Sequence, residues 1–438
     1  MKLIRQKDVR QVWSLAWPVM LANITFPLLG LVDTAVMGRL DGHEYLAGVA
    51  IGASIMTFIF WGFSFLAMGV SGQVSQAFGA GQNSLIKIHL VRYLFVAGGL
   101  SALLMLVHRP LIDWSLDWMG ASDLVSEQAK IYLSIRVLGI PAILFSITCL
   151  GWFVGMQNTR VALSTRMIAQ VVNIVLDVVF VMALHWQVAG VAWGTVIAEY
   201  LAALLVLLAV MKHSKTLPGI TWSEVFHKEA FKRIFATGQA LLSRTFVLLF
   251  TLAYFNHLGA GISDSILAAN AILLTFHNVI STALDGFADA GEALTGRAIG
   301  AKSRPQLIAA WRTTGVLSAG LALMLSLGFW LLGEQLIAIL TNQADLQSIA
   351  KDYLPWLCLM PLWGFVAFWL DGVFVGAHLS RQMRNAVILP FFLFFLPATL
   401  WFQPLDNHLL WLLFSLYFLF RSLLMLRYWT VFYHRLAF

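Results

Sequence analysis

The chain has 438 residues, of which 60% are hydrophobic and only 11% charged, and its mean hydropathy is +0.82. A soluble domain of this length cannot bury so much apolar side chain, so the composition indicates an integral membrane protein. The net charge is +7. Its basic residues are spread over alternate loops and do not gather on one segment, which argues against a nucleic-acid-binding protein.

Twelve apolar stretches follow one another along the chain, and each is long enough to cross a bilayer, which takes about 20 residues. The sequence therefore predicts an all-α, polytopic membrane protein with twelve transmembrane helices. The first stretch has no small-residue cleavage site and is too long for the core of a signal peptide, so we expect it to be retained. The predicted spans are approximately 12–37, 46–75, 88–107, 128–156, 162–184, 188–211, 234–257, 265–290, 307–331, 347–376, 385–403 and 408–433.

Lysine and arginine occupy every second loop, whereas the other loops carry acids. Basic residues precede the first span, follow every even-numbered span and include five side chains in the loop between spans 6 and 7. This bias places both ends of the chain in the cytoplasm. The acids of the opposite loops are Asp41, Glu44, Asp113, Asp117, Asp123, Glu127, Asp264, Glu334, Asp345 and Asp406.

The sequence repeats itself without gaps at an offset of 221 residues, so that Gly38 falls on Gly259 and Gly155 on Gly376. The repeat predicts two lobes of six spans, residues 1–217 and 234–438, joined by a linker at 218–233. Because each lobe has an even number of spans, we expect parallel repeats related by a pseudo-two-fold axis along the membrane normal. The mixed charge and aromatics of 212–231 suggest a cytoplasmic interfacial helix, and Gly151 and Gly155 suggest close helix packing.

Seven acids lie inside spans, where each costs about 2.5–3.5 kcal/mol, and none is duplicated by the repeat. Asp33 and Asp177 lie at a similar depth near external span ends, and Asn173 stacks on the helix face of Asp177. Partial desolvation favours the neutral form of a carboxyl group, which is what a reversible proton carrier needs. We therefore expect a polar pocket in the first lobe, with ordinary packing hydrogen bonds as the alternative. Its candidate members are Asp33, Asp177, Asn173, Thr195, Tyr132, Arg136 and Asn23.

The second lobe carries its own buried charges. Asp285, Asp289 and Glu292 form an acidic stripe on span 8, and Arg244 lies at the depth of Asp285. These residues form either a structural ion-pair network or a cytoplasmic gate. Asp371 stands alone in span 10, where it could contact a cation. Glu199, in span 6 of the first lobe, has no assigned role beyond helix packing.

Span 1 contains Pro18 and Pro27, which remove backbone hydrogen bonds and invite a kink that protonation of Asp33 could control. An inert kink is the alternative. The two cysteines, Cys149 and Cys358, do not correspond under the repeat and read as small buried residues. There is no metal-ligand cluster, phosphate loop or nucleophile motif, so the sequence predicts neither an enzyme nor a cofactor.

Several stretches resemble the multidrug and toxic compound extrusion (MATE) family, in its branch named after DNA-damage-inducible protein F. They begin at Pro27-Leu-Leu-Gly-Leu-Val-Asp33 and include Gln76–Ala80, Gly296–Ala301, Asn173–Asp177, Gly190–Glu199 and Leu284–Ala288. The resemblance covers nearly the whole chain. It implies two six-helix lobes around a cleft that opens alternately to each side, with export of amphipathic, often cationic drugs against protons or sodium.

In proton-coupled relatives the coupling residues match Asp33, Asn173 and Asp177, with polar neighbours matching Tyr132 and Thr195. Their kink-forming proline matches Pro18. Sodium-coupled relatives pair a glutamate in span 7 with the aspartate that matches Asp371, and span 7 here has no acid.

The working hypothesis is thus a monomeric proton/drug antiporter of a bacterial inner membrane, with H⁺ as the coupling ion and Na⁺ as the alternative. A sodium antiporter using Asp371 and, less favoured, a lipid-precursor flippase are the alternatives. The partners expected are the lipid bilayer and small organic cations.

Overall fold

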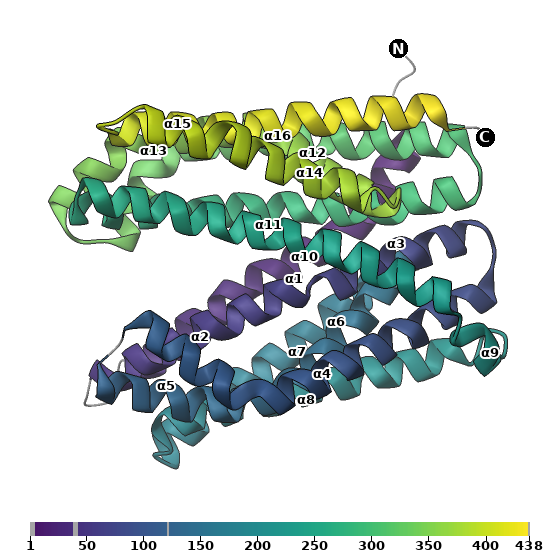
Figure 1. The fold of residues 1–438 in the computed structure, drawn as a ribbon, viewed down its shortest axis with the longest axis horizontal. Helices are drawn as coiled ribbons and strands as arrows, with labels where there is room; N and C mark the ends of the chain where they lie inside the picture. Colours follow the sequence, from purple (N-terminus) through teal and green to yellow (C-terminus); the bar gives the residue numbers. More distant parts are fainter. Residues whose placement is uncertain (1–4, 38–42, 121, 437–438) are drawn as a thin grey trace. The chain divides into compact units, whose positions relative to one another are not determined.

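The computed structural model describes residues 5–37, 43–120 and 122–436, apart from the side chains of residues 24–31, 34, 35 and 43. Every regular element in these ranges is helical, and none of them is a strand (Figure 1). The elements are α1 (Gln6–Met37), α2 (His43–Phe63), α3 (Phe65–Gly79), α4 (Asn83–Met119), α5 (Asp123–Arg136), η1 (Val137–Gly139), α6 (Ile140–Gly155), α7 (Thr159–Asp177), η2 (Val178–Ala183), α8 (Gln187–Ser214), α9 (Trp222–Val225), α10 (Lys228–Ile262), α11 (Asp264–Gly300), α12 (Arg304–Leu340), α13 (Ala344–Gly376), α14 (Ser380–Pro390), η3 (Phe391–Phe395), α15 (Leu396–Trp401) and α16 (Asn407–Arg435).

Among the described residues, 11 helical segments are long and apolar enough to span a membrane by length and composition. The first predicted span is α1, a helix of 32 residues. The expectation of an all-α polytopic membrane protein is confirmed. The helices extend beyond the apolar stretches because their polar ends stay helical, as where α12 begins at Arg304.

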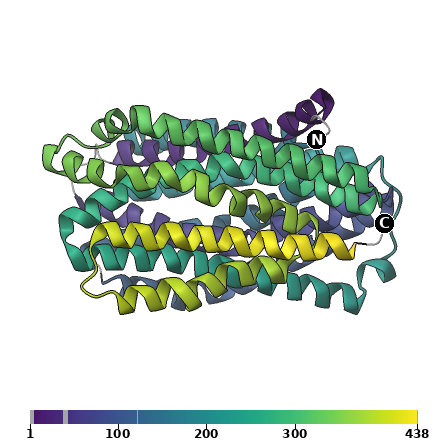
Figure 2. The same cartoon turned by 90° about the horizontal axis from the view of Figure 1, so that it is seen from above.

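The chain divides into two compact units. The first unit comprises Met1–Met20 with Ala236–Phe438 and so holds most of the predicted second lobe. The second unit, Leu21–Phe235, holds most of the predicted first lobe. In the first unit, α13 packs against α11, α12 and α16. These helices run side by side in both views (Figures 1 and 2). In the second unit, α6 packs in the same way against α3, α4 and α8. The unit boundary falls within two helices, α1 and α10.

The 221-residue repeat is visible in how the helices cross. Gly155 of α6 lies so close to α3 that a Cβ there would be 2.7 Å from the carbonyl oxygen of Ser71. Such a contact is tolerated only by glycine. Each crossing of one unit recurs 221 residues later in the other: Gly151 on Ala67 and Gly155 on Ser71, then Gly372 on Ala288 and Gly376 on Glu292. The packing role expected for Gly151 and Gly155 is confirmed.

The beginning of α1 belongs to the core of the first unit. Its side chains Val12, Leu15 and Ala16 pack with Phe287 and neighbouring apolar residues of α11 and α12. Gly286 gives the backbone of α1 room to approach. Pro18 is buried within this helix, and the backbone stays helical through Pro27, whose side chain lies outside the described part. Their role as a hinge remains a prediction.

The linker is not the interfacial helix that its composition suggested. Helix α8 ends at Ser214 and α10 begins at Lys228, and only the four-residue α9 lies between them. Pro218 and Gly219 fall in this gap and are poor continuers of a helix. The linker packs instead on α4, where Arg92 donates to two carbonyl oxygens of α9.

Candidate functional site

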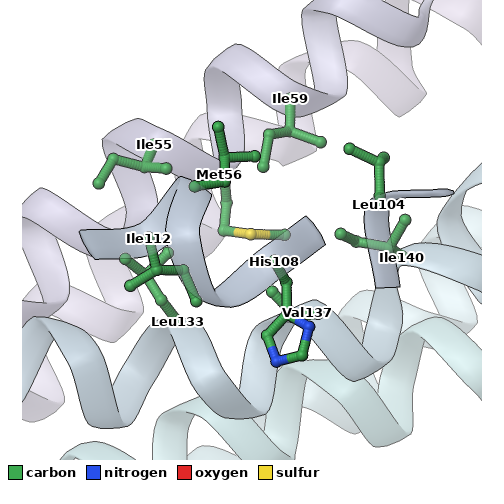
Figure 3. Close-up of a pocket in the computed structure, with 10 residues that line it drawn as sticks. Ile55, Met56, Ile59, Leu104, His108, Ile112, Leu133, Val137 and Ile140 are labelled. Atoms are coloured by element: carbon green, nitrogen blue, oxygen red, sulfur yellow. The ribbon is translucent and has the colours of Figure 1, made fainter. Parts of the chain in front are cut away.

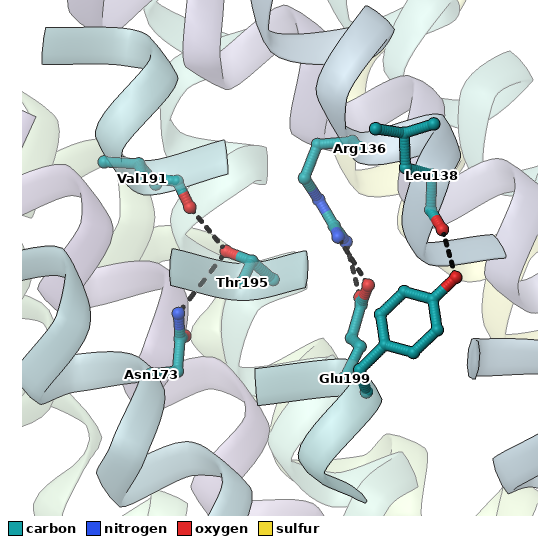
Figure 4. A network of polar contacts seen from close by, with 7 residues as sticks. Arg136, Leu138, Asn173, Val191, Thr195 and Glu199 are labelled. Carbon is teal, nitrogen blue, oxygen red and sulfur yellow. Dashed lines mark hydrogen bonds and ion pairs between the residues drawn. The ribbon is translucent and has the colours of Figure 1, made fainter. Parts of the chain in front are cut away.

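Four helical segments of the second unit bring the polar residues predicted for the first lobe together. Asp177 ends α7 and is 0% exposed, and Asn173, one turn earlier, is 1% exposed. The Asn173 amide donates to the Thr195 hydroxyl of α8 at 3.4 Å. That hydroxyl donates in turn to the carbonyl oxygen of Val191 at 2.9 Å. Figure 4 shows this chain of contacts.

The carboxyl groups of Asp33 and Asp177 are neighbours that interact directly. One oxygen of Asp33, both oxygens of Asp177 and the amide oxygen of Asn173 are buried without a hydrogen-bond partner among the described residues. The unsatisfied atoms are all acceptors. Such a set can bind a proton or a small cation, because a buried acceptor left unpaired is costly. We call Asp33, Asn173 and Asp177 the acceptor cluster.

Room for Asp177 comes from Gly194 on α8. A Cβ at residue 194 would overlap the Asp177 carboxylate oxygen. Sequence reasoning missed Gly194, although it lies one residue before Thr195. The described residues contain no group of three or more His, Cys, Asp or Glu side chains that could hold a metal ion.

Arg136, predicted as a pocket residue, forms a largely buried ion pair with Glu199 of α8. Its guanidinium makes two hydrogen bonds of 2.7 Å to the two oxygens of Glu199 (Figure 4). The Tyr132 side chain lies within range of the guanidinium charge, which also acts on both Asp33 and Asp177. The structure thus gives Glu199, which had no assigned role beyond helix packing, a role as the counter-charge of Arg136. Matching the depths of Arg136 and Glu199 on spans 4 and 6 would have suggested it.

Asn23, another predicted pocket residue, has a partner as well. Its side-chain oxygen accepts a hydrogen bond of 2.8 Å from Arg166 of α7. Asn23 therefore holds the second half of α1 on α7.

In the first unit, the expectation that Asp371 stands alone is wrong. One of its carboxylate oxygens accepts hydrogen bonds from both Arg244 of α10 and Arg421 of α16. All three side chains are buried. Arg244 thus pairs with Asp371 and not with Asp285, although the charge of Asp285 lies within range of this cluster. Arg421 was missed, and the signal was an arginine in the middle of the apolar run of span 12.

The remaining acids of the acidic stripe lie further along α11. Asp289 is half-buried and Glu292 is buried, and Gly376 of α13 crosses the backbone of Glu292. Asp285 has Asp289 among its charged neighbours. Asp285 thus lies within range of both Asp289 and the charges around Asp371.

A small apolar hollow lies between α2, α4, α5 and α6, and its lining does not include the acceptor cluster (Figure 3). Its polar lining side chain is His108, whose Nδ1 is 2.6 Å from the carbonyl oxygen of Met105. Within the described residues this hollow offers no polar group beyond His108 to orient a ligand, so it carries no function by itself.

Comparison with known proteins agrees with this architecture. The MatE family model matches residues 18–179 and 240–402, one segment in each repeat. The chain is 40% identical over 424 residues to DNA damage-inducible protein F of Escherichia coli, covering 96% of this chain and 92% of that protein. It is 22% identical over 410 residues to the probable multidrug resistance protein NorM of Photorhabdus laumondii, covering 90% and 88% of the two chains.

Solved structures share the fold. One is a transporter of the MOP superfamily from Pyrococcus furiosus, with 18% identity, a TM-score of 0.87 and coverage of 96% and 95%. Another, described as an outward-facing multidrug resistance MATE family transporter, has 19% identity, a TM-score of 0.88 and the same coverage of 96% and 95%. The family model and the bacterial relative both extend over the two units, so the chain belongs to the MatE family of multidrug and toxic compound extrusion proteins and is a membrane transporter, not an enzyme.

Proposed function

We propose that this transporter is a proton-coupled antiporter, which exports amphipathic, often cationic organic compounds from a bacterium across its inner membrane and works as a single chain. The main support for this proposal is the acceptor cluster. It contains two neighbouring carboxyl groups, and its buried oxygen atoms lack hydrogen-bond donors among the described residues. A relative named as a probable multidrug resistance protein supports the substrate class.

A proton suits the acceptor cluster chemically. When Asp33 or Asp177 is protonated, its hydroxyl supplies the donor that the other carboxylate lacks, and the repulsion between two negative charges disappears. An organic cation neutralises the same charges. Proton and drug therefore compete for one site, and this competition is one requirement for exchange.

Exchange also needs the two ligands to favour different conformations, since a ligand without such a preference shifts no equilibrium. The membrane potential and the pH gradient together supply enough free energy to drive export. One charge moving through 100 mV is worth about 2.3 kcal/mol, and one pH unit adds about 1.4 kcal/mol per proton.

The test uses the purified protein in proteoliposomes, with pH and sodium gradients imposed separately and efflux of tetraphenylphosphonium as the readout. We expect efflux with an inward proton gradient alone, and loss of at least about tenfold in Asp33→Asn and Asp177→Asn. The exposed Asp117→Asn is the matched control and should retain wild-type efflux. Undiminished proton-driven efflux in both site variants would refute the proposal.

Sodium coupling through Asp371 is the competing assignment. A sodium ion there would share the carboxylate with two buried guanidinium groups. Their positive charges oppose a further cation, although the second carboxylate oxygen has no partner among the described residues. Efflux that follows external sodium at constant pH and disappears in Asp371→Asn would nevertheless establish the sodium route.

A further inference from the structure

The ion pair between Arg136 and Glu199 lies beside the acceptor cluster but is not part of it. Its geometry is a two-pronged fork, with nitrogen–oxygen distances of 2.7 and 2.7 Å. The side chains are 8% and 19% exposed. A carboxylate whose two oxygens both accept from a guanidinium has little capacity left for a proton.

The backbone is shaped around this pair. Gly139 of η1 lies against Glu199, and a Cβ there would overlap the carboxylate oxygen and come within 3.3 Å of Arg136. The hydroxyl of Tyr200 donates to the carbonyl oxygen of Leu138 at 3.0 Å, which fixes α8 against the same turn. The chain therefore holds Glu199 at this position from both sides.

The repeat shows that the fold does not need the pair. At the offset of 221 residues, Arg136 corresponds to Leu357 and Glu199 to Phe420. Helices α13 and α16 still pack against each other in that unit, and Leu357 is fully buried. Phe420 is exposed and packs on Phe394 of η3. The corresponding helices thus pack without an ion pair at these positions, which leaves the charges of the second unit to be explained by function.

We propose that the Arg136–Glu199 pair sets how many protons the acceptor cluster exchanges in each cycle. The inference rests on the proposed proton coupling. Three acids surround the site, but Arg136 neutralises Glu199, so two exchangeable negative charges remain, on Asp33 and Asp177. Neutralising Arg136 and neutralising Glu199 should therefore change the number of exchanged protons in opposite directions.

The charged and titratable side chains on the described helices next to Arg136 each have another partner or carry no positive charge near Glu199. Tyr132 lies on its own helix, and Tyr200 on α8 bonds the backbone. Lys130 of α5 pairs with Asp113 of α4 at 2.5 Å, and both side chains are exposed. His108 of α4 faces α5 across the apolar hollow, with its ring bonded to the backbone (Figure 3). None of these groups replaces Arg136 as the counter-charge of Glu199.

The two single variants make opposite predictions. In Arg136→Gln, Glu199 loses its counter-charge, takes up a proton and gives it up when a cation binds, so proton release should rise by about one per substrate. In Glu199→Gln, the unneutralised guanidinium favours the ionised forms of Asp33 and Asp177, so release should fall by about one. The double variant removes both effects and should return to the wild-type number.

The experiment measures protons released per bound tetraphenylphosphonium with the full chain in detergent at pH 7, in weak buffer with a pH indicator. Arg136→Lys keeps the charge and should release the wild-type number. Gly139→Ala keeps both charges but pushes Glu199 away, and should behave like a partial Arg136→Gln.

Both results of this experiment are decisive for the pair. Opposite changes in the single variants that cancel in the double variant support the proposal. If all variants bind substrate and release the wild-type number while only thermal stability falls, the pair is structural and the inference is overturned. The proposed function fails separately, if the wild-type protein releases no protons or if Asp33→Asn releases as many as the wild type.

Discussion

Asp177 fits against α8 only because residue 194 has no side chain. Replacing Gly194 by alanine should therefore displace the carboxylate while the helix itself tolerates alanine well. We expect proton-driven efflux in proteoliposomes to fall by about tenfold, equivalent to about 1.4 kcal/mol, with little change in expression.

Gly99 provides the control for this substitution, because a Cβ there would meet nothing within 4 Å. Gly99→Ala should transport like the wild type. If Gly194→Ala also transports normally, the position of Asp177 is not critical to the exchange.

Asp371 should matter for stability and not for proton coupling. Asp371→Asn leaves Arg244 and Arg421 buried without a counter-charge, and breaking a buried pair costs about 3–5 kcal/mol. We expect a Tm in detergent lower by about 10 °C, with the tetraphenylphosphonium-induced proton release unchanged.

An apolar replacement of the whole cluster tests this interpretation of Asp371. The triple variant Arg244→Met, Asp371→Leu and Arg421→Met removes every charge together and should recover most of the lost stability. A wild-type Tm in Asp371→Asn, combined with lost sodium-dependent transport, would point to cation binding instead.

The linker is fixed by α4 through Arg92, whose guanidinium donates to Val225 at 3.0 Å and to Glu224 at 2.5 Å. Arg92→Met removes two hydrogen bonds from a charged donor, which are worth about 1.5–3 kcal/mol each. Trypsin should then cut at Lys215 and Lys228 at least about tenfold faster. Arg109→Met, an exposed change on the same helix, should leave the cleavage rate as it is.

Acid should loosen the same linker. The backbone N–H and the hydroxyl of Thr221 both donate to the Glu224 carboxylate, and these bonds hold the pKa of Glu224 below its usual value. A depressed folded-state pKa contributes stability above the unfolded value and loses it as pH falls through the folded one. Cleavage by an acid-active protease should therefore rise as pH drops below about 4.3, and Glu224→Gln should abolish this dependence.

The helices could be predicted from the sequence because a bilayer imposes length and apolarity on every span. The contacts of single charges could not. Asp371 meets Arg244 across 127 residues and Arg421 across 50, and such pairs depend on how each helix is rotated about its axis. The acceptor cluster was accessible to prediction because two of its members, Asn173 and Asp177, share one helix face.

The two units share a fold but differ in which of them carries ionisable residues at corresponding positions. The constant offset predicts the shared fold, and it does not predict this difference. Where the second unit places Asp33 on α1, the repeat places Tyr254 on α10, whose hydroxyl hydrogen-bonds Thr399 at 3.0 Å. Tyr254 thus takes the position of Asp33, and Ala398, the residue before Thr399, takes that of Asp177, so neither position carries an acid in the first unit.

The direction of exchange depends on how the chain is oriented in the membrane. Asp33 lies near the end of α1 at Met37, so protons reach it from outside only if that end is external. Cysteines introduced at Asp123 and Asp345 should react with a membrane-impermeant maleimide in intact cells. Cysteines at Lys215 and Arg435 should react only after permeabilisation. Both native cysteines are buried, so labelling of the parent chain should be low. The reverse pattern would place the acceptor cluster nearer the cytoplasm, and inward proton flow could then not drive export in the way proposed.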